Sequence, residues 1–126
     1  MEEIKNIIDD LGIAAFEANI KIAGLAVLSD SGNLVYQTDN WDLTNNTDMI
    51  LNVIKGDRHF VLNGGEFSVV GTTTEGIIGT SDSGMGYVIF TPFQGGVLVS
   101  YALPRADPPK ALAFLKSFAM SLNGKV

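Results

Sequence analysis

The side chains of this sequence that could take part in catalysis are few and scattered. The single histidine is His59, which follows Arg58 at the start of an apolar segment. Carboxylates lie close in sequence at Asp9-Asp10 and again at Asp39 and Asp42. Acid–base or metal chemistry needs such groups beside a nucleophile or at metal-ligand spacing, and neither is found here. We therefore expect no enzymatic activity, no metal and no cofactor.

Hydroxyl and glycine residues gather in segments that are typical of turns rather than of catalytic loops. Residues 72–75 (TTTE) and 80–83 (TSDS) have the composition of hairpin connections. Gly84-Met85-Gly86 is not a dinucleotide fingerprint, because no helical segment follows it to receive a pyrophosphate. Cysteine is absent, which excludes disulfides and thiolate chemistry and suits a reducing cytoplasm.

The charge pattern favours protein partners. The formal net charge is −6, and the eight basic residues do not cluster. Nucleic acids and anionic membranes need several cations on one face, so neither partner is expected. No stretch approaches the ~20 apolar residues that span a bilayer. The acidic start Met1-Glu2-Glu3 differs from the basic start of a secretory signal, so a cytoplasmic location is expected.

Apolar periodicity predicts the elements that would position these groups. Residues 3–18 carry an apolar stripe at helical spacing, and Gly12 is expected to bend or divide this helix. Residues 22–28 and 34–37 flank five turn-forming residues, which predicts a hairpin. Asn45, Asn46 and Thr47 offer cap oxygens to a short helix over 48–54, which ends at Gly56.

The second half of the chain reads as an antiparallel meander followed by a helix. Glycine turns separate four apolar runs, at residues 66–71, 76–81, 86–93 and 96–103. Asp107 can cap a last helix that has Pro108-Pro109 in its first turn and ends at Asn123-Gly124. We predict one α/β (α+β) domain over residues 1–126. Its central antiparallel sheet of six to seven strands carries both terminal helices on one face and the short helix on the other.

Three local strings in this order resemble the profilin family, in a divergent and archaeal-like form. They are residues 30–38 (DSGNLVYQT), 61–69 (VLNGGEFSV) and the turn 83–86 (SGMG). The resemblance implies a profilin-like fold and a cytoskeleton-associated protein that binds monomeric actin, or an actin homologue, and modulates its polymerisation. The roadblock family shares the element order but has three strands after its second helix. That alternative implies a homodimer that binds a small GTPase.

The resemblance also implies an actin-binding surface on the edge of the meander and the start of the last helix. Glu66, Gly71, Thr80 and Asp82 stand where better-known profilins carry basic residues. The partner is therefore expected to be a divergent actin with its own charge pattern, or the surface has another ligand. The candidate contact residues are Val69, Gly71, Thr80, Asp82, Tyr87, Arg105, Asp107, Lys110 and Ala113.

Profilins also hold proline-rich peptides between their terminal helices, on aromatic side chains. The first helix here has no Trp or Tyr, and Val35 stands in place of the family's groove tryptophan, so weak or altered binding is expected. Trp41 is expected to cover the core rather than to hold a peptide. Phosphoinositide binding is not expected, because basic clusters are lacking. The candidate residues for proline-rich peptides are Ile4, Val35, Trp41, Phe114 and Phe118.

Overall fold

The computed structural model describes residues 2–39 and 41–126. Within these residues a single antiparallel sheet of seven strands has the order β2-β1-β7-β6-β5-β4-β3. The strands are β1 (Ile22–Ser29), β2 (Leu34–Gln37), β3 (His59–Leu62), β4 (Gly65–Thr72), β5 (Ile77–Ser81), β6 (Tyr87–Phe93) and β7 (Gly96–Ala102). The α-helices are α1 (Glu2–Glu17), α2 (Thr47–Lys55) and α3 (Pro108–Ala119), and short 3₁₀ helices span Thr44–Asn46 and Met120–Leu122.

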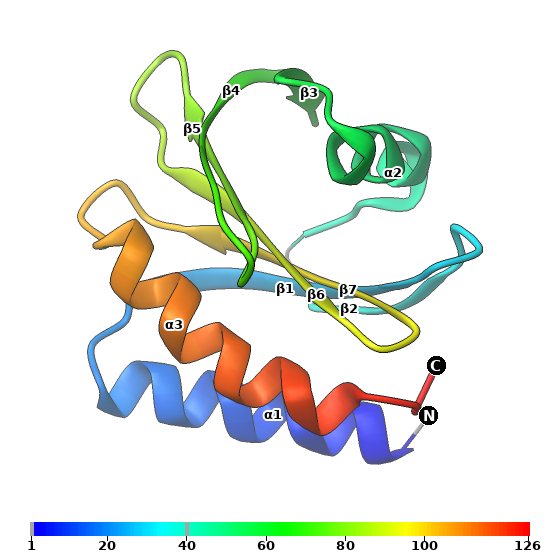
Figure 1. The fold of residues 1–126 in the computed structure, drawn as a ribbon. Coiled ribbons are helices and arrows are strands. Elements are labelled where there is room, and N and C mark those ends of the chain that lie inside the picture. The colour runs from blue at the N-terminus through cyan, green and yellow to red at the C-terminus, as the bar shows by residue number, and fades with distance from the viewer. Residues whose placement is uncertain (1, 40) are drawn as a thin grey trace.

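The helices cover the two faces of the sheet unequally. Helices α1 and α3 lie side by side on one face, and α2 lies on the other (Figure 1). This arrangement and the strand number confirm the predicted fold. The five strands that follow α2 within the described residues exclude the three-strand roadblock plan. The start of α1 and the C-terminal segment meet, where Lys125 Nζ lies 2.8 Å from Glu3 Oε2.

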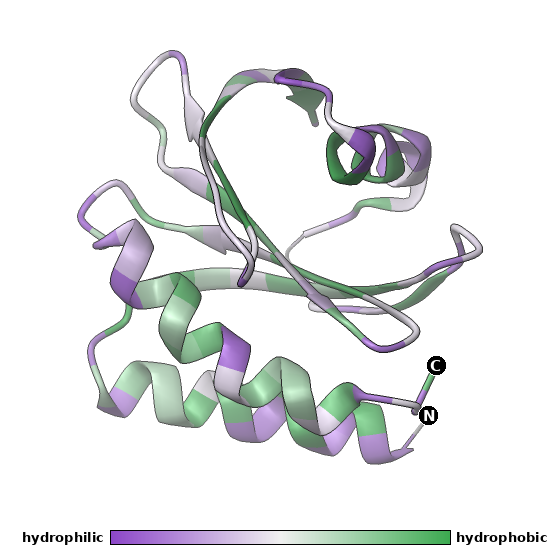
Figure 2. Ribbon diagram, viewed as in Figure 1, coloured by the Kyte–Doolittle hydropathy of each residue, from purple (hydrophilic) through white to green (hydrophobic). Residues whose placement is uncertain are grey.

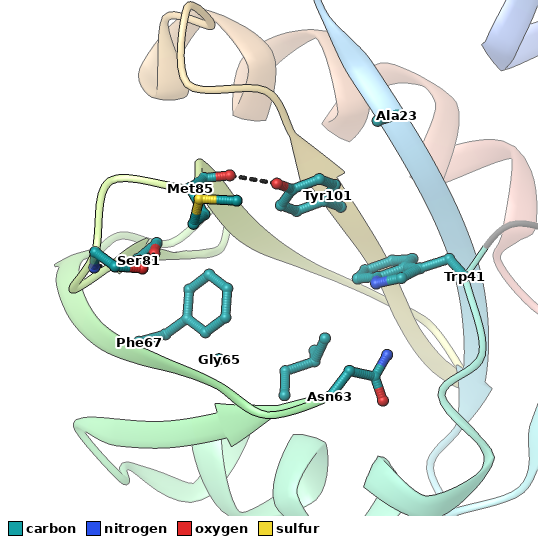
Figure 3. Close-up of a pocket in the computed structure, with 10 residues that line it drawn as sticks. Ala23, Trp41, Asn63, Gly65, Phe67, Ser81, Met85 and Tyr101 are labelled. Atoms are coloured by element: carbon teal, nitrogen blue, oxygen red, sulfur yellow. Dashed lines mark hydrogen bonds between the residues drawn. The ribbon is translucent and has the colours of Figure 1, made fainter.

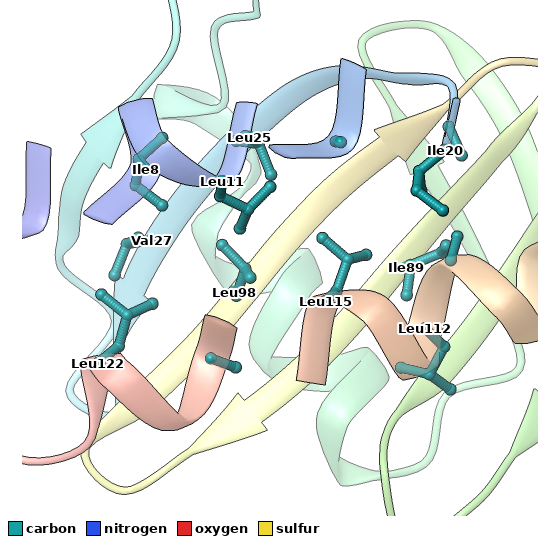
Figure 4. Close-up of a cluster of buried hydrophobic side chains, with 14 of the residues drawn as sticks. Ile8, Leu11, Ile20, Leu25, Val27, Ile89, Leu98, Leu112, Leu115 and Leu122 are labelled. Carbon is teal, nitrogen blue, oxygen red and sulfur yellow. The ribbon is translucent and has the colours of Figure 1, made fainter. Parts of the chain in front are cut away.

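The larger core cluster lies between the sheet and the terminal helices. Leu11 of α1, Leu98 of β7 and Leu115 of α3 are fully buried in it (Figure 4). Helix α1 runs without interruption through Gly12, so the predicted bend is wrong. The reason is that Gly12 faces solvent, where a Cβ would meet nothing within 4 Å, and no packing contact acts on it to bend the helix.

The opposite face has its own core beneath α2. Ile50 and Val53 of α2 are buried here, and the ring of Phe60 stacks on Phe67 with centroids 5.2 Å apart. Trp41 is 9% exposed and packs in this cluster, which confirms its predicted place over the core. Apolar residues run along the central strands, whereas the hairpin turns are hydrophilic (Figure 2). No helix in the described parts of the chain is long and apolar enough to cross a membrane.

The helix ends agree with the sequence at Gly56 and Asp107 but not at the start of α2. Gly56 ends α2 with φ 126°, and Asp107 Oδ1 accepts from the Lys110 backbone N–H at 3.3 Å. The predicted side-chain cap of α2 is wrong, because a 3₁₀ turn leads into the helix and no cap hydrogen bond forms. Asn46 instead donates its side-chain N–H to Asn63 Oδ1 at 2.9 Å, which ties α2 to the turn between β3 and β4.

Candidate functional site

On the sheet face that carries α1 and α3, the outer strands are not covered by either helix. Helix α3 contacts β5, β6 and β7, and Lys116 of α3 donates to the Pro92 carbonyl of β6 at 3.1 Å. Beyond this cover, Val61 of β3 is 53% exposed and Val70 of β4 is 60% exposed. We call this surface the open strip and define it by His59, Val61, Glu66, Ser68, Val70, Gly71, Thr80, Asp82 and Tyr87.

The strand register brings most of the predicted sheet residues onto the open strip. Thr80 pairs with Tyr87 across β5 and β6, and Gly71 pairs with Ile78 across β4 and β5. Asp82 follows β5 directly and is exposed. A Cβ at Gly71 would meet nothing within 4 Å, so this part of the strip lies open to an approaching surface.

Val69 lies apart from the other predicted sheet residues. Its side chain is 9% exposed and packs with Phe60 and Phe67 on the α2 side of the sheet. Successive side chains of a strand point to opposite faces, so Val69 points away from its exposed neighbour Val70. A bulge between Val69 and Gly71 then returns Gly71 to the helix side. The structure therefore places Val69 in the core and its neighbours on the open strip.

The predicted residues around the start of α3 form a charged continuation of the open strip. Arg105, Lys110 and Ala113 are exposed, and Asp107 is held as the helix cap. Arg105, Asp107 and Lys110 line a hollow of about 180 Å³ together with Lys21 and Asn19 from the loop after α1. Lys21 was not among the predicted residues, because only the packing of this loop against α3 reveals its proximity. Three of the chain's eight basic residues thus meet at this end.

A polar network crosses the other end of the open strip. Ser68 Oγ donates to Asp82 Oδ1 at 2.8 Å and lies 3.1 Å from His59 Nδ1. A catalytic triad places the histidine between the serine and the carboxylate, so that the histidine can take the serine proton. Here serine stands in the middle and gives its hydrogen bond to the carboxylate. The network therefore orders the surface of β3, β4 and β5 without activating a nucleophile.

The residues predicted for proline-rich peptides divide between the two faces of the sheet. Ile4, Val35, Phe114 and Phe118 belong to the core cluster of the terminal helices, and the rings of Phe114 and Phe118 lie 5.3 Å apart. Trp41 lies on the α2 side. The structure thus brings four of the five residues to one side and separates Trp41 from them.

Comparison with known proteins identifies relatives that match nearly the whole chain. No family model matches the sequence. The chain is 31% identical to Loki profilin-1 and 30% identical to Loki profilin-2 of Lokiarchaeum sp. (strain GC14_75), covering at least 96% of the chain and of each relative. A LokiProfilin1/Rabbit Actin Complex matches all of this chain and 98% of that one, with a TM-score of 0.88 and 29% identity.

More distant profilins share the fold alone. Acanthamoeba castellanii profilin II matches with a TM-score of 0.68 and 17% identity, and the match covers 82% of this chain and 86% of that one. The agreement in strand number, helix placement and whole-chain identity to the archaeal relatives leads to one conclusion. The chain belongs to the profilin family.

Proposed function

We propose that this protein binds monomeric actin or an actin homologue and modulates its polymerisation, by binding rather than by catalysis. The observation that carries the proposal is its whole-chain likeness to LokiProfilin1 and LokiProfilin2, each of which was solved in complex with rabbit actin. The matches cover 100% of this chain, with TM-scores of 0.88 and 0.87. A protein of this function is cytoplasmic and associated with the cytoskeleton.

The open strip and the start of α3 are the proposed contact surface. Exposed apolar side chains at Val61 and Val70 lie among polar residues, which is the composition of a protein interface with an apolar centre and a polar rim. Gly71 and Thr80 would contact the partner between the valines and α3. Tyr87 joins these strands to the helix start, because it pairs with Ala102 of β7 as well as with Thr80.

Opposite charges at the two ends of this surface would fix the orientation of the partner. Arg105 and Lys110 supply positive charge beside α3, while Glu66 and Asp82 supply negative charge on the outer strands. Complementary charges mainly raise association rates and exclude wrong orientations. We infer that the cognate actin carries an acidic group opposite α3 and a basic group opposite β4 and β5.

Binding of proline-rich peptides is proposed as a weak secondary property of the terminal helices. Phe114 and Phe118 are half-buried, and Val35 of β2 packs against the same core cluster. Peptide recognition by aromatic grooves gains from indole or phenol donors that bind peptide carbonyls. Phenylalanine and valine side chains have no such donors, so these three residues supply only the apolar part of the interaction.

An actin assembly assay tests the proposal. Spontaneous polymerisation of rabbit actin should slow as the protein is added, because a profilin-bound monomer is withheld from nucleation. A charge-reversed Lys110→Glu variant serves as the surface control and should slow assembly less at the same concentration. Unchanged assembly at saturating protein, with no complex by gel filtration, would contradict the proposed function.

A further inference from the structure

A hollow of about 340 Å³ lies on the α2 side of the sheet, away from the open strip. Trp41, Phe67 and Tyr101 form its aromatic walls, and Met85 lies at its edge (Figure 3). Its other lining residues are Ala23, Leu62, Asn63, Gly65, Ser81 and Ser83. This volume falls within the range of roughly 300 to 1,000 Å³ that is typical of small-molecule sites.

The walls of this hollow are held in place by their surroundings. The indole of Trp41 packs on the backbone of β1 at Gly24, where a Cβ would come within 2.9 Å of the ring. The rings of Trp41 and Tyr101 lie 6.1 Å apart with a tilt of 38°. The Tyr101 hydroxyl donates to the Met85 carbonyl, which fixes the turn between β5 and β6 against β7. A ligand would therefore enter a largely preformed site.

The hollow contains an unused hydrogen-bond donor. Trp41 is nine-tenths buried, yet its indole N–H has no acceptor among residues 2–39 and 41–126. Within those residues, the polar side-chain atoms fully shut off from solvent without a partner are Thr91 Oγ1 and Ser100 Oγ. The indole N–H is not one of them, so it remains accessible to solvent, and Trp41 lines the hollow. This N–H therefore has water as its acceptor in the free protein, and a ligand oxygen that replaces this water would keep the hydrogen bond while the ligand ring is buried.

The other polar groups of the hollow are already engaged. Asn63 donates to the Asp42 carbonyl at 3.0 Å and accepts from Asn46, and Ser81 and Ser83 bond to each other at 3.2 Å. Among the described residues, those that line the hollow carry no charge. Aromatic walls favour flat rings, and the absence of charge favours a neutral ligand because an ion would lose its hydration without a counter-charge.

We propose that this hollow is a binding site for a small neutral ring compound whose carbonyl oxygen accepts a hydrogen bond from the indole N–H of Trp41. The ring lies between Trp41, Phe67 and Tyr101, and Met85 adapts to its outer edge through its flexible thioether. This site is on the opposite face from the proposed actin surface, so its test is independent of actin binding.

Nuclear magnetic resonance can test the site directly, because Trp41 is the single tryptophan and gives the single indole N–H signal. Acetophenone is the probe, and cumene is a control of similar shape without an acceptor. Acetophenone should shift the indole signal with a dissociation constant on the order of 1 mM. Cumene should bind about fivefold more weakly, since one hydrogen bond is worth about that factor. Equal affinity of the two compounds, or no shift with acetophenone, would overturn the proposal.

Two variants locate the ligand. Trp41→Phe keeps a ring but removes the donor, so the preference for acetophenone over cumene should vanish when binding is followed through the methyl signal of Met85. Gly65→Leu places a side chain beside Phe67, within the hollow, and should abolish binding of both compounds. Gly12→Ala on the exposed side of α1 is the control and should bind acetophenone as the unmodified protein does.

The variants also give results that would refute the site. Acetophenone binding that survives Gly65→Leu, or a preference over cumene that survives Trp41→Phe, would place the ligand elsewhere. The second variant keeps the test decisive if Gly65→Leu does not fold. Decaproline tests a peptide occupant: if it displaces acetophenone and reproduces the indole shift, the small-molecule assignment is wrong.

Discussion

The two faces of the sheet are closed in different ways, and each leaves a different surface open. On one face α1 and α3 pack against the central strands, and their cover ends before β3 and β4. On the other face the nine-residue α2 covers part of the sheet and leaves the hollow beside Trp41. The first face offers a broad, exposed strip suited to a protein, and the second offers a small, preformed hollow.

Simple dimensions explain why the outer strands stay open on the first face. The seven strands within the described residues, at about 4.8 Å spacing, span roughly 29 Å. Two packed helices of about 10 Å diameter cover roughly 20 Å of that width. The order β2-β1-β7-β6-β5-β4-β3 places the terminal helices over the middle and the β1 side. The uncovered part is therefore on the β3 side, where the open strip lies.

The largest effect is predicted for a leucine-to-alanine substitution made in each of the two cores, which compares their contributions to stability. Leu115 on the terminal-helix side and Leu43 on the α2 side are both fully buried. Leu115→Ala should lower the free energy of unfolding by ~3 to 5 kcal/mol and Leu43→Ala by ~2 to 3 kcal/mol, because Leu115 lies in the larger cluster, enclosed by two helices and the sheet, where the residual cavity should be larger. Urea unfolding of both variants measures the difference. An equal or larger loss for Leu43→Ala would show that the α2 side is packed as rigidly as the other.

The second prediction compares how charge reversal on each face of the sheet changes the affinity for actin. Lys110→Glu should weaken binding to rabbit actin by ~1 to 3 kcal/mol, through lost attraction and new repulsion, and more strongly at low salt. The thermal stability should change by less than ~0.5 kcal/mol, because the site is exposed. Calorimetric titration at two salt concentrations measures the effect. Lys55→Glu, on α2, is the matched control and should leave the affinity unchanged; equal losses in both variants would mean a non-specific charge effect.

The third prediction concerns proline-rich peptides. Decaproline should bind no more tightly than about 1 mM, because the aromatic side chains of α3, Phe114 and Phe118, carry no hydrogen-bond donor. Its binding should disappear in Phe118→Ala and persist in Trp41→Phe, since these residues lie on opposite faces. Nuclear magnetic resonance titration of the three proteins decides the matter. Loss of binding in Trp41→Phe alone would move the peptide to the α2 side.

The smallest effect is expected where the chain ends meet. The hydrogen bond from Lys125 holds the pKa of the Glu3 carboxyl below its ordinary value of 4.5. A lowered folded-state pKa stabilises the fold above pH 4.5, and this contribution is lost as the pH falls through the folded value. Thermal unfolding of the protein and of Glu3→Gln should differ slightly at pH 6 and converge below the folded-state pKa. A difference that grows on acidification would contradict this linkage.

The sequence was sufficient to predict elements whose pattern is local. Helical spacing in residues 3–18, the glycine turns and the Asp107 cap each specify their own structure, and together they predicted the order and layers correctly. The side of the sheet on which a residue lies was harder to predict. Val69 was placed with Gly71, but the bulge between them changes the alternation, and bulges leave no clear mark in the residues themselves.

Contacts between segments that are distant in the sequence could not be predicted either. Asn46 was expected to cap α2, but its side chain bonds to Asn63, 17 positions away. The His59–Ser68–Asp82 network depends on the register of three strands, and Lys21 joins Arg105 only through the packing of a loop. In each case the residue type was visible, and its partner was set by the tertiary structure.

Hydrogen exchange of the protein with and without rabbit actin tests the central claim most directly. Binding through the open strip should protect backbone amides in β4, β5 and the segment 105–113, because these lie on or beside the proposed contact surface. The amides of α2, on the opposite face, should exchange at the same rate in both states. Protection confined to α2, or no protection anywhere at saturating actin, would contradict the account.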